Sequence, residues 1–338
     1  MRLRINDNLG APMQIECKTL YNLLRMNWLR HPAIMVEPWQ VDDYRAMQIE
    51  SIFQRLAAEE IYLDRVSFLA LAGETDTPED CTEALLVDLP MDPSTHDKIY
   101  LLIFELWRRF VPEKQCLSIF CDELDQQIDL YDRGKISETG TIQDILDNLV
   151  VILDENADQG VNPCEAFASV SKLCAHDLET FLYDFIADQL DRHNYTYAAE
   201  LLDDFKAYVQ EIKWFELLHA RLIAATDQAQ LGLIIQEIME WAKEQPDLEF
   251  NFELLSILAL GGGKDLFLSL VKQSLPLLRT EDDFRDLLAI SADFLQGLDY
   301  DSKELIVQGI VKKRSGIASE RPFDHKSSDV NGLLEALK

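Results

Sequence analysis

The sequence has few basic residues and no apolar run long enough to span a bilayer. Lysine and arginine number 31 against 61 aspartates and glutamates, which gives a formal net charge of −30. The longest apolar stretches, such as residues 99–104 and 149–153, are far shorter than the ~18 uncharged residues of a membrane-spanning helix. Residues 1–7 place charge where a signal peptide has its apolar region. We therefore expect a cytoplasmic protein without a membrane span.

Cysteine is sparse, and no Cys-x-x-Cys pair occurs. The chain is 338 residues long and 48% hydrophobic, which is enough for one large domain or two ordinary ones with a core of their own. A disulfide framework or a structural zinc site is not expected from so few, widely spaced thiols. We expect reduced thiols at Cys17, Cys81, Cys116, Cys121, Cys164 and Cys174.

The negative charge is concentrated in the middle of the chain. Residues 66–302 carry 47 acidic and 16 basic side chains, whereas residues 1–65 and 303–338 are nearly balanced. Such a field repels phosphate backbones and anionic lipid and attracts basic proteins or cations. We expect no nucleic-acid partner. The alternative is that the acidic residues serve solubility alone.

Residues 1–90 read as a small mixed α/β region. Residues 2–5 and 13–17 alternate apolar and polar side chains, which predicts a short strand pair. A helix is expected over residues 41–60. Three prolines, with threonine and aspartate, make residues 73–93 the candidate linker or long loop.

Residues 94–314 predict an all-α body. One helix is expected from a Ser94 or Thr95 cap to Phe110, ahead of Pro112. Two further segments carry stripes at helical spacing that are apolar except at Ser291, at positions 231, 234, 235, 238 and 241 and at 284, 287, 288, 291, 295 and 298. Short connections favour stacked antiparallel helical hairpins, as an α-solenoid or a multi-helix bundle.

The segment 181–209 resembles a tetratricopeptide-like hairpin. Asn194-Tyr195 resembles its turn, and Ala198 and Leu201 resemble positions of its second helix. Bulky Ile186 replaces the small residue of the first helix, and no 34-residue period follows. Residues 315–338 predict a flexible polar tail that ends in a short helix with an apolar patch.

The segment 154–165 resembles an EF-hand calcium loop, because oxygen-bearing side chains recur at ligand spacing and a glutamate stands at the last position. Gln159 occupies the place of the usual turn glycine. Asn-Pro-Cys-Glu at residues 162–165 is also typical of a capped helix start. The predicted calcium ligands are Asp154, Asn156, Asp158, Gly160, Asn162 and Glu165.

The segment 282–286 has the pattern Asp-Asp-x-x-Asp, which resembles the motif that holds magnesium and diphosphate in all-α terpenoid synthases. The resemblance implies a metal-dependent enzyme that uses Asp282, Asp283 and Asp286. No second metal motif follows. Thr280 ahead of three acidic residues is also typical of a capped helix N-terminus.

The sequence contains no Gly-x-Ser-x-Gly, no His-Glu-x-x-His and no dinucleotide-binding fingerprint. We therefore predict a non-enzymatic scaffold, adaptor or chaperone-like module that binds a basic or helical protein segment and needs no cofactor. Two alternatives stay open: a magnesium-dependent enzyme acting on a diphosphate through residues 282–286, and a calcium-responsive protein working through residues 154–165. Catalytic residues can also meet only in three dimensions.

Overall fold

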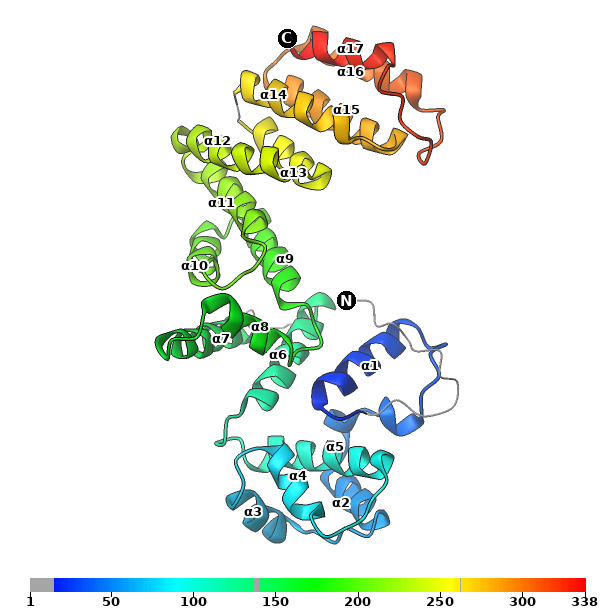
Figure 1. Ribbon diagram of the computed structural model, residues 1–338, viewed down its shortest axis with the longest axis vertical. Helices are drawn as coiled ribbons and strands as arrows, with labels where there is room; N and C mark the ends of the chain where they lie inside the picture. Colours follow the sequence, from blue (N-terminus) through cyan, green and yellow to red (C-terminus); the bar gives the residue numbers. More distant parts are fainter. Residues whose placement is uncertain (1–14, 136–139, 262) are drawn as a thin grey trace. The chain divides into compact units, whose positions relative to one another are not determined.

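The computed structural model describes residues 15–135, 140–261 and 263–338. In these ranges the chain forms seventeen α-helices and three 3-10 helices, and the described residues contain no strand (Figure 1). The predicted all-α class is confirmed. The predicted strand at residues 2–5 lies outside the described residues, as do residues 13 and 14 of the second predicted strand, and the described residues 15–17 form no strand. No helix in the described ranges is long and apolar enough to cross a membrane.

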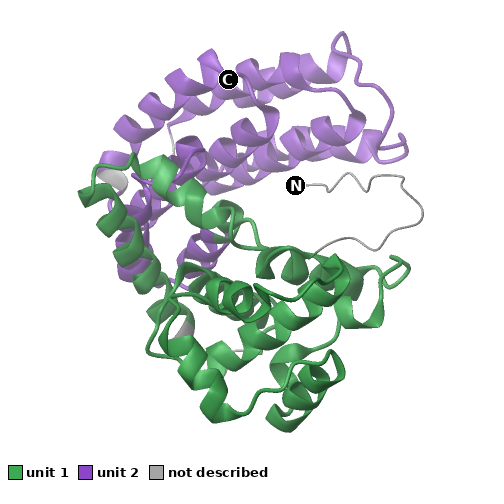
Figure 2. Cartoon of the chain, turned by 60° about the horizontal axis from the view of Figure 1, so that its bottom comes forward, with its two compact units in different colours: residues 1–181 green, residues 182–338 purple. Residues whose placement is uncertain are grey.

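The chain divides into two compact units, Met1–Phe181 and Leu182–Lys338, drawn in different colours in Figure 2. The division falls inside α9 (Leu178–Asp191). The boundary predicted near residue 90 lies within unit 1, where the elements before and after that residue share one core.

Unit 1 contains eight α-helices before α9 and two 3-10 helices in its described residues. They are α1 (Lys18–Arg30), η1 (Pro38–Gln40), η2 (Tyr44–Ala46), α2 (Ile49–Ala58), α3 (Arg65–Gly73), α4 (Pro78–Leu86), α5 (Pro93–Phe110), α6 (Leu117–Asp132), α7 (Gly140–Asp158) and α8 (Pro163–Ser171).

Helix α5 forms the centre of the unit 1 core. Every side chain from Ile99 to Trp107 is buried, and α5 packs against α2, α4 and η2. The helix ends at Phe110, just before Pro112, as the sequence predicted. Its cap differs from the prediction: Asp92 accepts hydrogen bonds from the amides of residues 94 and 95, because Pro93 begins the helix and lacks an N–H.

The prediction of a linker over residues 73–93 is wrong, because α4 occupies its middle. Thr77 caps α4, and Pro78 begins it. Cys81 and Leu86 then anchor α4 in the core of unit 1. The helix predicted over residues 41–60 is also shorter than expected, since η2 precedes α2 and the regular helix begins at Ile49.

Unit 2 contains the remaining helices in its described residues. They are the second half of α9, α10 (Tyr195–Phe205), α11 (Ile212–Thr226), α12 (Gln228–Glu244), α13 (Leu248–Ala259), α14 (Lys264–Ser274), η3 (Leu275–Leu277), α15 (Glu281–Gly297), α16 (Asp301–Arg314) and α17 (Ser328–Leu337).

The two predicted apolar stripes both face the core of unit 2 for most of their length. On α15, Phe284 to Leu295 are buried at each stripe position, and only Leu298, just past the helix end, is partly exposed. On α12, Leu231, Ile235 and Ile238 are buried. Trp241 departs from the prediction, because its ring is 42% exposed at the end of the helix.

Residues 315–338, predicted to form a flexible tail, pack against the rest of unit 2. The amide of Phe323 donates a hydrogen bond of 2.9 Å to the carbonyl of Arg279, and its ring lies against Phe284 with centroids 4.6 Å apart. The predicted terminal helix is present as α17. Its Leu333 and Leu337 are fully buried, so apolar burial contributes to holding the segment in place.

Candidate functional site

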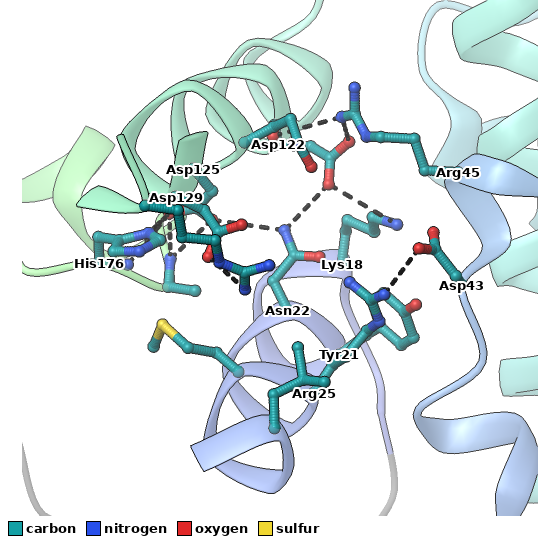
Figure 3. A pocket seen from close by; sticks show the side chains of 15 residues that line it. Lys18, Tyr21, Asn22, Arg25, Asp43, Arg45, Asp122, Asp125, Asp129 and His176 are labelled. Atoms are coloured by element: carbon teal, nitrogen blue, oxygen red, sulfur yellow. Dashed lines mark hydrogen bonds and ion pairs between the residues drawn. The ribbon is translucent and has the colours of Figure 1, made fainter. Parts of the chain in front are cut away.

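A polar cleft lies between α1 and α6 of unit 1 (Figure 3). Each helix supplies residues from a single face, because side chains three or four positions apart lie side by side on a helix. The central residues are Lys18, Asn22 and Arg25 of α1, Asp122, Asp125 and Asp129 of α6, and His176 from the loop after α8.

Asp122 is the centre of the cleft. Its carboxylate is 4% exposed and forms ion pairs with Arg45 (Nη2–Oδ2, 2.5 Å) and Lys18 (Nζ–Oδ1, 3.6 Å). The amide of Asn22 donates a hydrogen bond of 2.9 Å to Oδ1. Burial acts to raise the pKa of the Asp122 carboxyl, but the charges of Lys18 and Arg45 outweigh it and hold the pKa below its ordinary value. The carboxylate is therefore a stable anion that anchors two cations.

Asp125 binds the loop that follows α8. Its carboxylate accepts hydrogen bonds from the amides of Ala175 (2.8 and 2.9 Å) and His176 (3.0 Å). The Nδ1 atom of the His176 ring lies 2.9 Å from Oδ1 of the same carboxylate. Both oxygens thus have partners within the chain, and the carboxylate fixes the loop against α6.

A chain of ion pairs extends from the cleft into α5. Arg45 also pairs with Glu123 (2.9 Å), which lies 3.7 Å from Arg108. Glu105 is fully buried and pairs with Arg108 (2.7 Å) and Arg109 (3.3 Å). Arg109 in turn donates hydrogen bonds to three backbone carbonyls of residues 44, 45 and 47. The network therefore ties α1, the η2 segment, α5 and α6 together.

The size of the cleft limits its chemistry. Its volume is about 60 Å³, enough for a few water molecules. Small-molecule sites usually enclose about 300 Å³ or more. The charged groups of the cleft also have partners within the chain. We therefore interpret their contacts as stabilising the packing of α1 against α6.

The predicted calcium ligands fall on three kinds of structure. The last turns of α7 contain Asp154, Asn156 and Asp158. There the side-chain amide of Asn156 donates a hydrogen bond of 2.7 Å to the backbone carbonyl of Ile152. Gly160 follows in a turn with φ of +90°. Asn162 caps α8 through hydrogen bonds from the amides of residues 164 and 165, as expected of a helix start. The calcium site stays a prediction.

Glu165, the last predicted calcium ligand, stands in the first turn of α8. In the described ranges no group of three or more histidine, cysteine, aspartate or glutamate side chains is arranged to bind a metal ion.

The acidic residues of the 282–286 motif occupy the first turns of α15. Asp283 completes a capping box with Thr280 and accepts hydrogen bonds from the amides of residues 279 and 280, which outweigh burial and lower its pKa. Burial and the two neighbouring acids raise the pKa of Asp286. Asp282 lies 3.8 Å from Arg285. The helix cap is confirmed, and the magnesium site stays a prediction.

Large apolar side chains remain exposed beside acidic residues in both units. In unit 1 they include Tyr62, Val66 and Val87, each at least 75% exposed. In unit 2 they include Leu233 and Leu305, each about 70% exposed. Exposed apolar groups that cluster often mark binding surfaces. These surfaces are the candidate functional sites of the chain.

Sequence reasoning missed both the cleft and these surfaces. The charged faces of α1 and α6 were visible at helical spacing, but their pairing joins residues about one hundred positions apart, which no local pattern reveals. The largely apolar segment 66–72 inside an acidic stretch was the available signal for the surface on α3. The chain matches no family model, and comparisons with curated proteins and with solved structures find no match.

Proposed function

We propose that this chain is a non-enzymatic helical scaffold that binds a basic segment of a partner protein. The observation that carries the proposal is the exposure of large apolar side chains on an acidic surface, as at Tyr62 and Val66. Apolar area supplies affinity when it is removed from water, and complementary charge supplies orientation and a fast association rate.

The charge of the chain supports a basic partner. A formal net charge of −30 attracts cationic segments and repels nucleic acid and anionic lipid. The use of Asp122 and Asp125 in internal contacts supports a structural role for the polar cleft. The six cysteines are free thiols, which fits the reducing cytoplasm that we propose as the location of the protein.

The architecture that we propose for the scaffold is a stack of antiparallel helical hairpins within each unit. In unit 2 the consecutive pairs α11–α12, α15–α16 and α16–α17 are in contact, and short connections link the first two pairs. Short connections between contacting helices favour antiparallel neighbours. Such stacks present extended surfaces to elongated partners.

The proposal is tested with the full chain and three labelled peptides of equal length. One is a basic amphipathic helix of lysine and leucine, the second is its scrambled sequence, and the third replaces lysine with glutamate. Fluorescence anisotropy should show the tightest binding for the basic amphipathic peptide and weaker binding at higher salt. Equal affinity for all three peptides, or binding of none, contradicts the proposal.

A further inference from the structure

Helix α3 is apolar on nearly all sides but buried on only one. Its inner residues Phe68 and Ala72 are fully buried in the core of unit 1. Its outer side carries Val66, which is 75% exposed, and Leu69, which is 37% exposed. A helix that is apolar all round is usually covered on every side. The outer side of α3 therefore has the composition of a buried surface.

The exposed apolar surface continues around α3. On α3, Ala70 is exposed four residues after Val66, and Tyr62, in the non-helical residues just before the helix, is 80% exposed. Residues spaced by four lie in line along one side of a helix. We refer to Tyr62, Val66, Leu69 and Ala70 as the α3 face.

Helix α4 adds a hollow to the same part of unit 1. The two helices contact each other and are joined by residues 74–77, and both lie in the blue-to-cyan part of the chain in Figure 1. The hollow has a volume of about 550 Å³. Its lining combines apolar side chains with two carboxylates and one imidazole and consists of Ala84, Leu86, Val87, Leu89, Met91, Asp80, Glu83 and His96.

The segment that contains both helices is almost entirely negative in charge, whereas Lys114 from outside it donates hydrogen bonds to the carbonyls of residues 72, 73 and 75 at the end of α3. Residues 59–92 contain ten acidic side chains and one basic side chain, Arg65. The guanidinium of Arg65 lies over the ring of Phe110, with 4.9 Å between the guanidinium carbon and the ring centroid. Exposed acidic residues near the α3 face and the hollow are Glu60, Asp64, Asp80, Glu83 and Asp88.

We propose that the α3 face binds a basic amphipathic helix of a partner protein, with the acidic residues around it pairing with the partner's lysines and arginines. This inference rests on the proposed function. It specifies the binding surface and the kind of partner segment that binds there. The nine residues of α3 span about 13 Å, which matches two to three turns of a bound helix. Such a helix presents apolar anchors at i, i+3 or i+4, and i+7. Negative charge argues against an anionic membrane or a nucleic acid as the occupant.

The test measures the affinity of the full chain for the basic amphipathic peptide and compares Val66→Lys with Val151→Lys. Val151 is the matched control, because it is an exposed valine (53%) on α7 of the same unit. Val66→Lys removes an apolar contact and adds a charge that repels the peptide. It should weaken binding by about tenfold or more, and Val151→Lys should change it by less than about twofold.

A second pair of variants tests the charge. Glu83→Lys reverses an exposed acidic residue on α4, and Glu244→Lys does the same at an exposed position on α12 of unit 2. Glu83→Lys should slow association and reduce the salt dependence of the affinity more than Glu244→Lys does. Circular dichroism of each variant, recorded with temperature, confirms that it is folded.

The outcomes separate the inference from the proposed function. If the peptide binds the wild-type chain and all four variants equally well, the proposed function survives. The inference that the α3 face is the binding site is then overturned. If the peptide does not bind the wild-type chain, the proposed function itself fails. Self-association of the chain that Val66→Lys abolishes, without peptide binding, overturns the inference in favour of a second copy as occupant.

Discussion

Arg45 and Asp122 form an ion pair of 2.5 Å that joins the η2 segment to α6 across 77 positions of the sequence. The carboxylate is buried, whereas the guanidinium is a quarter exposed. Removing one partner of a buried pair leaves the other charge without compensation in a low-dielectric environment. The stability of unit 1 should therefore depend strongly on this carboxylate.

Asp122→Asn should lower the free energy of unfolding by about 3 kcal/mol, because Lys18 and Arg45 lose their common anion. Urea denaturation measures the change. Asp129→Asn is the control on the same helix, since Asp129 pairs with a half-exposed Arg133. That variant should lose less than about 1 kcal/mol. Equal losses in both variants would contradict the central role of Asp122.

The contribution of Asp122 should also depend on pH. Its pKa in the folded chain is lowered, because the charges of Lys18 and Arg45 outweigh the effect of burial. The stabilisation is therefore present above the unfolded-state pKa, near 3.9, and is lost as pH falls through the lower folded-state value. The stability difference between wild type and Asp122→Asn should stay constant from about pH 7 to 5 and shrink below about pH 4. A stability difference between the two proteins that does not shrink below about pH 4 would contradict a lowered pKa of Asp122.

Arg314 should hold the C-terminal segment of unit 2 in place. Its buried guanidinium makes two hydrogen bonds of 2.5 Å to Glu281 and one of 2.8 Å to Asp329. Arg314→Met should cost about 3 kcal/mol and speed hydrogen exchange in α17, because both carboxylates lose their partner. Lys312→Met, an exposed position on the same helix, is the control and should leave exchange in α17 unchanged. Exchange in α17 that stays as slow as in the wild type in both variants would contradict this role of Arg314. Apolar contacts would then suffice to hold α17.

For the 154–165 segment we expect no calcium-specific stabilisation. Three of the six predicted ligands lie on the regular helix α7, whereas calcium-binding loops wrap their ligands around one point. A thermal melt with chelator, with calcium and with magnesium at matched ionic strength measures this. A rise of the melting temperature that is specific to calcium and abolished by Glu165→Gln would establish the site instead.

Local patterns predicted the helices whose start or stripe is encoded in neighbouring residues. Thr280 was recognised as a cap, and it closes a capping box with Asp283. The same reasoning failed at α4, because threonine, proline and acidic residues favour a loop and a helix start alike. Thr77 and Pro78 serve the second role. The burial of Cys81 distinguishes a helix start from a loop at this position. That burial depends on tertiary contacts, which the local sequence does not show.

Contacts between distant segments could not be predicted from the sequence. Lys312, Lys313 and Arg314 fit a helix C-terminus by their charge, but Arg314 is buried between acidic residues of other helices. Likewise, the polar composition of the C-terminal tail favours flexibility, yet Phe323 packs against Phe284. In both cases the contacts of a few buried side chains determine the structure of the segment, although its overall composition is polar.

The most direct test of the central claim is hydrogen–deuterium exchange of the full chain with and without the basic amphipathic peptide at saturation. Binding at the α3 face should slow exchange within α3, at residues 65–73, and leave α12 and α16 of unit 2 unchanged. Slower exchange in α12 or α16 with none in α3, or no change at any amide, would contradict the claim.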